Sequence, residues 1–439
     1  MLGGVDEQPA RRPPLPLPES PPPGPFRSGF WRSRLRGPWL ASILSAALLP
    51  LIVVCAATGF LSHVAYQPDL GTNSVTGSGG IDFDLYFFDW PTSPSWLYAL
   101  TQGLHVITGV AAIPILLAKL WTVIPRLFTW PPVRSIAHGV ERLGLTLLVG
   151  GSLLVFATGV MNVQLWYPFP FSFVPVHYYA AFIFLAALAF HIGSLLPVFR
   201  RSLKEMGLRQ PLAERTEETE VEPSAEERGF VGDDPRPATI SRRGLLATVA
   251  AGSVGLAVIA AAQSIGGPLR GLAVLAPRRD VPGSGPNDFQ VNKAFASVGI
   301  REEQTGAAWR LQVAGGTREI TLSRDQLLAL PQATETLPIA CVEGWSTTQT
   351  WTGVRLSDLA RMAGTEDAGE MRAESLQPKG AFRQATLSRG QTTDSRSLLA
   401  LQVNGEDLSL DHGFPARIIV PALPGVHNTK WVSKLTFAA

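Results

Sequence analysis

The stretch LPIACVEGWSTTQTWTG, residues 337–353, decides the fold of the C-terminal part of the chain. An apolar, strand-like run ends at Cys341, and a Glu-Gly-Trp turn follows it. From about residue 287 onward, short strands with period-2 patterning alternate with turns and one or two helices. We therefore expect an α+β domain with a substantial β core over residues 287–439, with Cys341 at the end of a buried strand.

The chain before this domain is far more apolar. Of the 439 residues 46% are hydrophobic and only 16% are charged, and almost all long apolar runs precede residue 266. Four runs have about the 20 residues that are needed to cross a hydrocarbon core. They lie at about 39–63, 96–120, 143–165 and 175–198. We expect a four-helix transmembrane domain over residues 39–200 and a fifth, less apolar transmembrane helix at 244–265.

Arginine and lysine predict the orientation of these helices. The segments before the first helix, between the second and third, and after the fourth are basic, whereas residues 64–95 and 162–177 contain neither Lys nor Arg. The positive-inside rule then places the N-terminus in the cytoplasm. The fifth helix runs outward, so we expect a multi-pass protein of the cell membrane, in contact with lipid, whose C-terminal domain is extracytoplasmic.

Two segments have compositions that disfavour packing. Residues 1–38 form a Pro- and Arg-rich cytoplasmic tail that we expect to be disordered, and residues 201–240 form a charged cytoplasmic linker that we expect to be flexible. The net charge of +2, with arginines clustered beside apolar segments, argues against a nucleic-acid partner.

The fifth apolar run begins with paired arginines, Arg242 and Arg243, in the sequence TISRRGLL. Over residues 241–267 this pattern is typical of a twin-arginine signal, which an export receptor reads on proteins that fold before they cross the membrane. The alternative is that the two arginines anchor the cytoplasmic end of an ordinary transmembrane helix.

Histidines in the membrane part are candidate ligands, because ionisable residues at membrane depth are costly and usually functional. His177 and His191 are fourteen residues apart, which places them on one face of a helix about 21 Å from each other. This spacing suits two b-type haems, each needing imidazoles from two helices. By depth we pair His63 with His177 and His105 with His191. The alternative is that these histidines are interfacial residues, and this is our interpretation of His138.

The four positions resemble those of the di-haem cytochrome b subunits of membrane formate dehydrogenases and nickel-iron hydrogenases. In that family one histidine lies on each of the first two helices and two lie on the fourth. The resemblance covers about residues 40–200 and implies electron exchange with the quinone pool. Here His63 ends the first helix instead of beginning it.

Cys341 taken alone is most simply an inert core residue. A thiolate is, however, a good ligand for a soft metal, and one protein thiolate suffices when an organic cofactor supplies the other sulfurs.

The C-terminal domain resembles the sulfite oxidase family of molybdenum-cofactor enzymes. The C-x-x-G-W motif at Cys341 and the pattern N-G-x-x-L-x-x-x-H-G-x-P-x-R at residues 404–417 carry this resemblance over about residues 289–439. It implies that Cys341 ligates molybdenum beside a molybdopterin dithiolene and is the catalytic residue. The implied cofactor-binding residues are Cys341, Trp345, Ser346, His412, Arg417, His427 and Lys430. The early Arg and His region of the family is represented only by NDFQVNKAFASVGI, which has no histidine.

Together these features predict a membrane oxidoreductase that transfers an oxygen atom to or from a small substrate, such as a sulfoxide, sulfite or another oxyanion, and exchanges electrons with quinone through b-haems. Two alternatives remain. The domain can be an inactive binding module on a haem-bearing anchor, or the helices can tether an active enzyme without holding haem.

Overall fold

The computed structural model describes residues 20–66, 88–133, 135–278, 283–365 and 368–438. The chain divides into two compact units. Unit 1 comprises residues 1–45, 117–151 and 183–247, and unit 2 comprises residues 46–116, 152–182 and 248–439.

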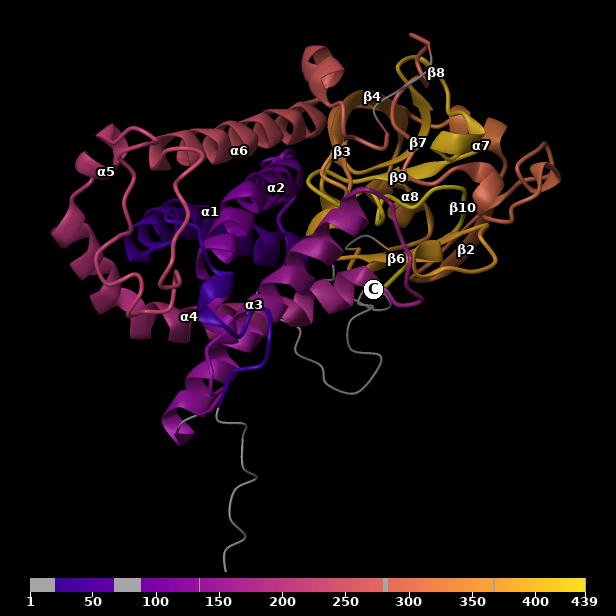
Figure 1. Ribbon diagram of the computed structural model, residues 1–439. Coiled ribbons are helices and arrows are strands. Elements are labelled where there is room, and N and C mark those ends of the chain that lie inside the picture. The colour runs from indigo at the N-terminus through magenta and orange to yellow at the C-terminus, as the bar shows by residue number, and fades with distance from the viewer. Residues whose placement is uncertain (1–19, 67–87, 134, 279–282, 366–367, 439) are drawn as a thin grey trace, which may run out of the picture. The chain divides into compact units, whose positions relative to one another are not determined.

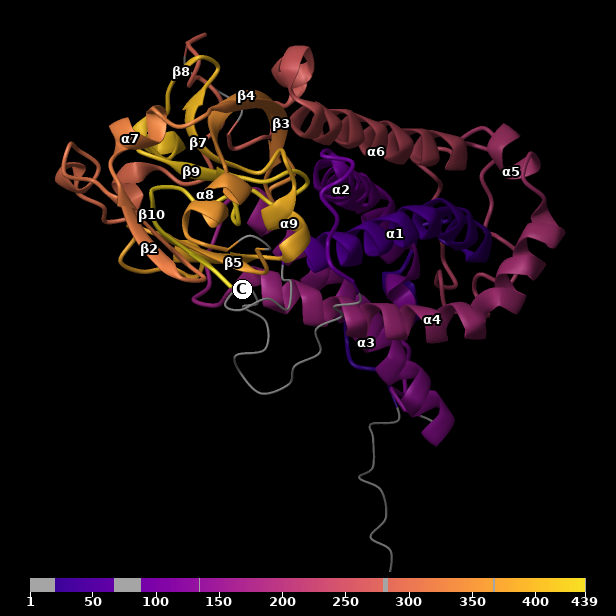
Figure 2. The ribbon, with the colours of Figure 1, turned by 180° about the vertical axis from the view of Figure 1, so that it is seen from behind.

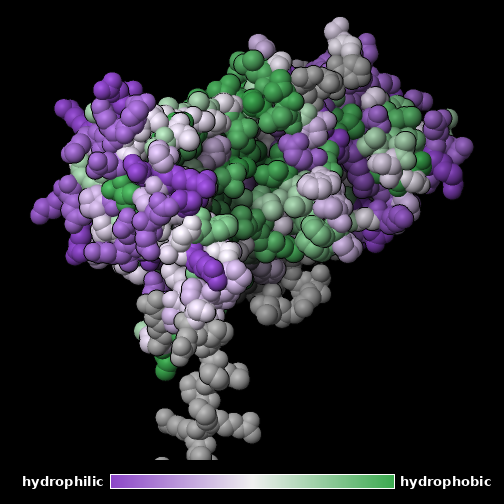
Figure 3. All heavy atoms as spheres, in the orientation of Figure 1, coloured by the Kyte–Doolittle hydropathy of each residue, from purple (hydrophilic) through white to green (hydrophobic). Residues whose placement is uncertain are grey.

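Among the described residues, five helices are long and apolar enough to cross a membrane. Their bounds are α1 Pro38–Tyr66, α2 Leu97–Val123, α3 Ile136–Val163, α4 Phe173–Met206 and α6 Arg242–Ile265. Each overlaps a predicted span, although α3 begins seven residues before its predicted start and α4 ends eight residues after its predicted end. Many of their large apolar side chains are exposed, and hydrophobic residues gather over these helices in Figure 3. Such a surface is typical of membrane helices, because their outward-facing apolar side chains contact lipid instead of water. The chain is therefore a candidate membrane protein.

In unit 1 the segment before α1 is described from residue 20, and it makes aromatic contacts. Residues Ser28–Phe30 form a short 3-10 helix, and Trp31 Nε1 donates to the carbonyl of Pro25 at 2.8 Å. The ring of Trp31 packs against Phe128 at 5.8 Å between centroids. Aromatic contacts thus order a segment whose proline content argued for disorder. The prediction for residues 1–19 lies outside the described residues.

The segment after α4, which we expected to be flexible, is also packed within unit 1. It contains the short helix α5, Gln210–Ala213. Ala225 and Phe230 are buried in a cluster with Ala41 of α1. The few apolar side chains of this charged segment are thus enough to anchor it.

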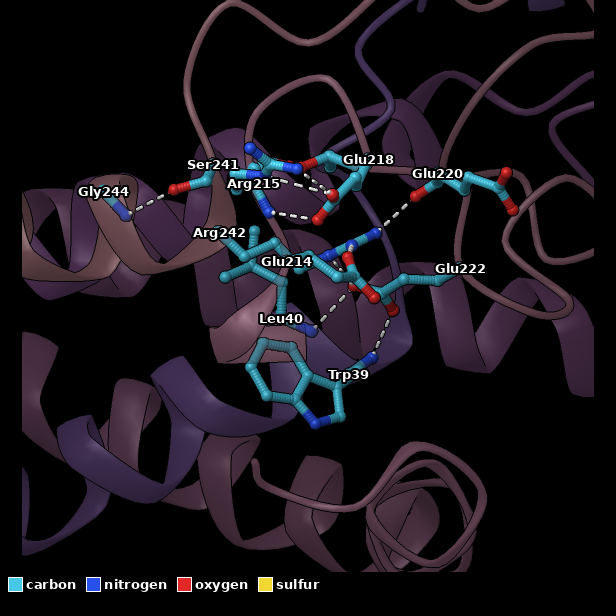
Figure 4. A network of polar contacts seen from close by, with 11 residues as sticks. Trp39, Leu40, Glu214, Arg215, Glu218, Glu220, Glu222, Ser241, Arg242 and Gly244 are labelled. Atoms are coloured by element: carbon cyan, nitrogen blue, oxygen red, sulfur yellow. Dashed lines mark hydrogen bonds and ion pairs between the residues drawn. The ribbon is translucent and has the colours of Figure 1, made fainter. Parts of the chain in front are cut away.

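A buried ion-pair network holds the same segment to two helix starts (Figure 4). Glu222 accepts hydrogen bonds from the amides of Trp39 and Leu40 at the start of α1, at 2.6 and 3.1 Å. A carboxylate there satisfies amide groups that have no partner within the helix. Arg242, the first residue of α6, pairs with Glu214 at 2.7 Å and with Glu222 at 3.5 Å. Burial raises the pKa of Glu222, while the amides and Arg242 oppose that rise.

We expect Glu222→Leu to lower the free energy of unfolding by about 3 kcal/mol, because it removes one partner of a buried charge pair and two amide contacts. Thermal unfolding of the detergent-solubilised chain measures the loss. The control is Glu218→Gln, which removes the solvent-exposed pair with Arg215 and should leave the unfolding temperature unchanged. Equal effects of the two substitutions would contradict a special role for the buried network.

The C-terminal domain, in unit 2, contains two five-stranded sheets. The first has the order β2-β1-β10-β5-β6, in which only β1 and β10 are parallel. Its strands are β1 Leu311–Gly315, β2 Arg318–Leu322, β5 Met371–Ser375, β6 Gln384–Leu387 and β10 Val432–Phe437. The second has the order β3-β4-β7-β8, with β9 pairing β7. Its strands are β3 Ala333–Ala340, β4 Ser346–Arg355, β7 Leu398–Val403, β8 Glu406–Asp407 and β9 Arg417–Ile419.

Three short helices complete this domain: α7 Arg324–Leu328, α8 Leu356–Met362 and α9 Arg389–Thr393. Helix α8 lies between the two sheets when the domain is seen from either side (Figures 1 and 2). Its Leu356 and Leu359 join one apolar core with Val313 of β1, Leu399 of β7 and Leu435 of β10. The predicted α+β domain with a substantial β core is confirmed.

The hairpin of β3 and β4 presents two different faces. On one face threonine hydroxyls meet across the strands, Thr334 with Thr352 at 2.9 Å and Thr336 with Thr350 at 3.1 Å. On the other face the indole of Trp351 is buried. This alternation fixes the register, because a slip of one residue would expose the apolar set. It also fixes the position of the turn between Ala340 and Ser346.

Candidate functional site

Cys341 is the first residue of the turn between β3 and β4, as the sequence predicted. Its amide donates to the carbonyl of Trp345 at 2.9 Å, and the amide of Gly344 donates to the carbonyl of Cys341 at 3.0 Å. Gly344 has φ +90°, a conformation that favours glycine. The backbone of the turn is thus closed on itself, and the Cys341 side chain is buried.

The surroundings of Cys341 disfavour a free thiolate. Burial raises the pKa of the Cys341 thiol to about 12, and the negative charge of Glu343 acts in the same direction. A thiol with such a pKa is a poor nucleophile near neutral pH. A bound metal cation reverses this balance, because coordination removes the proton from a thiol outright. A free nucleophilic cysteine is therefore disfavoured at this position, whereas a metal-bound thiolate and an inert core thiol both agree with its burial.

Glu343 is a feature of the turn to which our sequence analysis assigned no role. It is only 6% exposed, and its carboxylate accepts from Arg278 Nε at 2.8 Å and from Trp345 Nε1 at 2.9 Å. The predicted cofactor residue Trp345 is thus held by an acid in its own turn. The sequence signal for a role of Glu343 is a lone acid beside a cysteine in an apolar stretch. Its partner Arg278 could not be found in this way, because it lies 65 residues away.

Arg417 and Lys430 form the most unusual electrostatic feature of the domain. Both are buried, and their partners are main-chain carbonyls: Arg417 Nη1 donates to His412 O, and Lys430 Nζ donates to Lys293 O and Asp411 O. Burial lowers the pKa of Arg417 to about 9 and holds that of Lys430 well below its usual range. Arg417 Nε is buried with no partner.

Among the described residues, no carboxylate forms a salt bridge with Arg417 or Lys430. Burying two cations in this way costs free energy. A bound anion would offset that cost, and a phosphate accepts bonds from both an arginine and a lysine. The donor set therefore fits the phosphate of a molybdopterin. The two side chains approach each other at Gly413, where a Cβ atom would lie 3.1 Å from the Cβ atoms of Arg417 and Lys430.

The two predicted histidines of the domain are both neutral. His412 stacks on Phe289 at 3.7 Å, its Nε2 donates to Asn287 O, and burial lowers its pKa to about 3. His427 Nε2 donates to Tyr66 O at 2.7 Å, and burial lowers its pKa to about 4. Because Nε2 carries the proton, Nδ1 of His427 is an acceptor, and it is buried with no partner.

The predicted cofactor residues thus fall in two groups. Arg417, Lys430 and His412 lie together, as their shared contacts show. Cys341, Trp345 and Ser346 belong to the turn, where the Ser346 hydroxyl donates to the carbonyl of Ser264. A main-chain bridge connects the turn to the His427 segment, since the amide of Gly425 donates to Ala340 O at 2.8 Å.

In the apolar helices the structure brings His105 of α2 next to His177 of α4, with ring centroids 5.9 Å apart. His105 Nδ1 donates to Cys55 O at 2.8 Å, and His177 Nδ1 donates to Val155 O at 2.9 Å. A carbonyl can only accept, so both rings carry their proton on Nδ1 and leave Nε2 free to ligate. When two imidazoles ligate one metal from opposite sides, each ligating nitrogen lies about 2 Å from the metal. The two ring centroids are then about 6 Å apart.

Both rings pack closely against glycines. A Cβ atom at Gly59 would lie 2.7 Å from Cε1 of His105, and one at Gly159 would lie 3.2 Å from Cε1 of His177. The two residues thus fit the requirements of a bis-histidine metal site. Among the described residues no group of three or more His, Cys, Asp and Glu side chains is gathered to hold a metal.

The pairing of histidines differs from the one that helix depth suggested. We expected His63 to face His177, but the ring of His63 stacks on Tyr178 at 3.8 Å. The ring of His105 is instead oriented by the carbonyl of Cys55, and it meets His177. His191 belongs to unit 1, so its expected partnership with His105 stays a prediction. His138, also in unit 1, has its amide capped by Ser135 Oγ.

Comparison with known proteins identifies the class of the C-terminal domain. Residues 298–439 match the family described as oxidoreductase molybdopterin binding domain. These residues thus match a molybdopterin-binding oxidoreductase domain, and this part of the chain is similar to sulfite oxidases.

The relatives specify the likeness further. The chain is 30% identical over 155 residues to the mitochondrial sulfite oxidase of Drosophila melanogaster, a match that covers 30% of this chain and 27% of that protein. It is 35% identical over 132 residues to the uncharacterized oxidoreductase YuiH of Bacillus subtilis, covering 29% of this chain and 65% of the relative. A putative protein-methionine-sulfoxide reductase subunit, YedZ1 of Azospira oryzae, is 28% identical over 149 residues, covering 34% of this chain and 55% of the relative. The chain thus spans less than a third of the sulfite oxidases it matches.

Proposed function

We propose that this protein is a membrane-bound, quinol-dependent sulfoxide reductase. The observation that carries the proposal is the buried Cys341 turn together with the buried Arg417 and Lys430, which donate hydrogen bonds to main-chain carbonyls. A thiolate ligand and a phosphate site are what a molybdopterin requires from the protein. The name of the Azospira oryzae relative, a putative protein-methionine-sulfoxide reductase subunit, supports a sulfoxide as the substrate class.

Bound molybdopterin supplies two-electron oxo-transfer chemistry. Cys341 would hold the metal. Arg417 and Lys430 would bind the phosphate, and the unpartnered Nδ1 of His427 would accept a hydrogen bond from the cofactor. Trp345 and Ser346 keep the turn in place through Glu343 and Ser264. The Glu343 carboxylate accepts hydrogen bonds from Arg278 and Trp345, and these contacts fix the conformation of the turn next to Cys341.

The helices would supply the electrons. We propose that His105 and His177 hold a b-type haem, which carries one electron at a time. The Nδ1 contacts to Cys55 and Val155 fix the ring orientations, and Gly59 and Gly159 allow the rings to pack closely against their helices. This assignment replaces the pairing of His63 with His177. It leaves a second haem, at His191 of α4, as a separate prediction.

The overall reaction balances without a further reactant. A quinol gives up two electrons and two protons to become a quinone, and the sulfoxide takes both to become a sulfide and water. The orientation that the basic loops predict places the C-terminal domain outside the cytoplasm of a cell membrane, where the substrate arrives. Export as a folded domain through the twin-arginine receptor agrees with a cofactor that is inserted in the cytoplasm.

The test uses the purified full-length chain in lipid nanodiscs, with molybdenum and haem quantified first. After reduction with a quinol, addition of methionine sulfoxide or dimethyl sulfoxide should oxidise the haem, and one sulfide should form for every two electrons. Sulfite is the opposing arm, suggested by the sulfite oxidase relatives. If sulfite reduces the oxidised haem while sulfoxides have no effect, the reaction runs in the oxidising direction. Fully loaded protein that responds to neither substrate would refute the proposal.

A further inference from the structure

The turn that carries Cys341 is held by the ends of two apolar helices in unit 2. Gln102 Nε2 of α2 donates to Val342 O at 2.6 Å. Gln263 Nε2 of α6 donates to Glu343 O at 2.9 Å, and Ser264 Oγ donates to Gly344 O at 2.6 Å. Three consecutive carbonyls of the turn therefore each accept a hydrogen bond from one of these helices.

These contacts are buried. Gln102, Gln263 and Ser264 are 9%, 8% and 8% exposed. Ordering and desolvating glutamine side chains is costly, so buried amides are found where a specific partner satisfies them. The backbone of Gly344 also approaches α2 closely, since a Cβ atom there would lie 2.9 Å from Cγ2 of Val106. The turn is thus recognised by shape and by hydrogen bonds.

The two helices contribute differently. Helix α2 also holds His105, and its two contacts with the turn, Gln102 and Val106, stand three residues before and one residue after that histidine. Helix α6 contains no histidine. Between His105 and Cys341 the path along Gln102 and Val342 is covalent except for a single hydrogen bond.

We propose that Gln102 and Val106 form the contact through which electrons pass from the haem at His105 to the metal at Cys341, whereas Gln263 and Ser264 only position the turn. This inference rests on the proposed function. Each sulfoxide reduced requires two electrons, which the quinol supplies and which cross this contact one at a time. Gln102 and Val106 touch no substrate, so both are positioning residues for electron transfer.

The structure offers a matched pair of variants. Gln102→Leu and Gln263→Leu each remove one hydrogen bond to neighbouring carbonyls of the same turn. In full-length, quinol-reduced protein, rapid mixing with dimethyl sulfoxide should show haem oxidation slowed about tenfold or more in Gln102→Leu. The effect in Gln263→Leu should be much smaller. Val106→Ala, a milder change on α2, should also slow haem oxidation. It replaces Gln102→Leu in the test if that variant does not fold.

Two further readouts separate electron transfer from simple positioning. Sulfoxide reduction driven by reduced viologen, which delivers electrons to the metal directly, should be unchanged in all three variants. Amide hydrogen exchange over residues 341–345 should rise equally in Gln102→Leu and Gln263→Leu, because each loses one anchor of the turn.

Equal slowing of haem oxidation in the two glutamine variants, or unchanged oxidation in both Gln102→Leu and Val106→Ala, would overturn the inference. A loss of viologen-driven activity in the α2 variants would do the same. Unsubstituted protein that lacks haem, or whose haem does not respond to sulfoxide, would overturn the proposed function as well. Failure of the proposed function is thus seen in the unsubstituted protein, whereas failure of this inference alone is seen only in the variants.

Discussion

Cys341→Ser should lose its molybdenum and at least about 100-fold of its sulfoxide turnover, with an unchanged haem spectrum. Serine keeps the volume and the turn, because the turn is closed by the main chain of residues 341, 344 and 345. What it removes is the soft thiolate, and a hydroxyl oxygen is a poor substitute in so buried a position. Elemental analysis and a reduced-minus-oxidised spectrum measure the two effects on one sample.

The control for this experiment is Cys55→Ser, which changes the other cysteine of the chain. It lies in α1 and should leave the molybdenum content unaltered. If Cys341→Ser retains stoichiometric molybdenum and full turnover, Cys341 is an inert core residue. The alternative of an inactive binding module on a membrane anchor would gain support if the unsubstituted chain held no molybdenum and showed no turnover.

His177→Leu should abolish b-type haem absorbance while leaving molybdenum and viologen-driven sulfoxide reduction intact. The reason is that His177 supplies one of two Nε2 atoms that the structure leaves free to ligate, and a leucine offers no lone pair. Quinol-driven turnover should then fall to background. The comparison of the two electron donors places the defect in the helices and not in the C-terminal domain.

Two more substitutions test the pairing. His105→Leu should match His177→Leu, whereas His138→Leu should keep the full absorbance. Loss of haem in His63→Leu with retention in His105→Leu would restore the pairing that helix depth suggested. Absence of b-type bands in the unsubstituted protein would leave the helices as a tether only.

Several features were predictable because they depend on neighbours in the chain. Each of the five candidate spans follows from the length of one apolar run, and each overlaps its predicted range. Cys341 at the end of a buried strand follows from the apolar run that precedes it and the turn after it. The motif around Cys341 and His412 indicated the class of the domain, which the comparisons support.

Other features arise from residues far apart in sequence, and local patterns carry no signal for them. Arg278 neutralises Glu343 across 65 positions, and Glu222 binds the start of α1 across more than 180. The contacts of the segment after α4 are also of this kind. The same is true of His105, whose orientation depends on a carbonyl of another helix.

The amino-acid sequence alone determined which segments are apolar enough for lipid, that a β-containing domain lies in the C-terminal part, and which single thiol stands in a metal-binding motif. Only the tertiary structure decided which histidines meet, that two cations are buried beside each other, and that Gln102 of α2 holds the Cys341 turn. The division has one physical cause. Periodicity and hydropathy are properties of adjacent residues, whereas ligation and hydrogen bonding between elements depend on distances that exist only after the chain has packed.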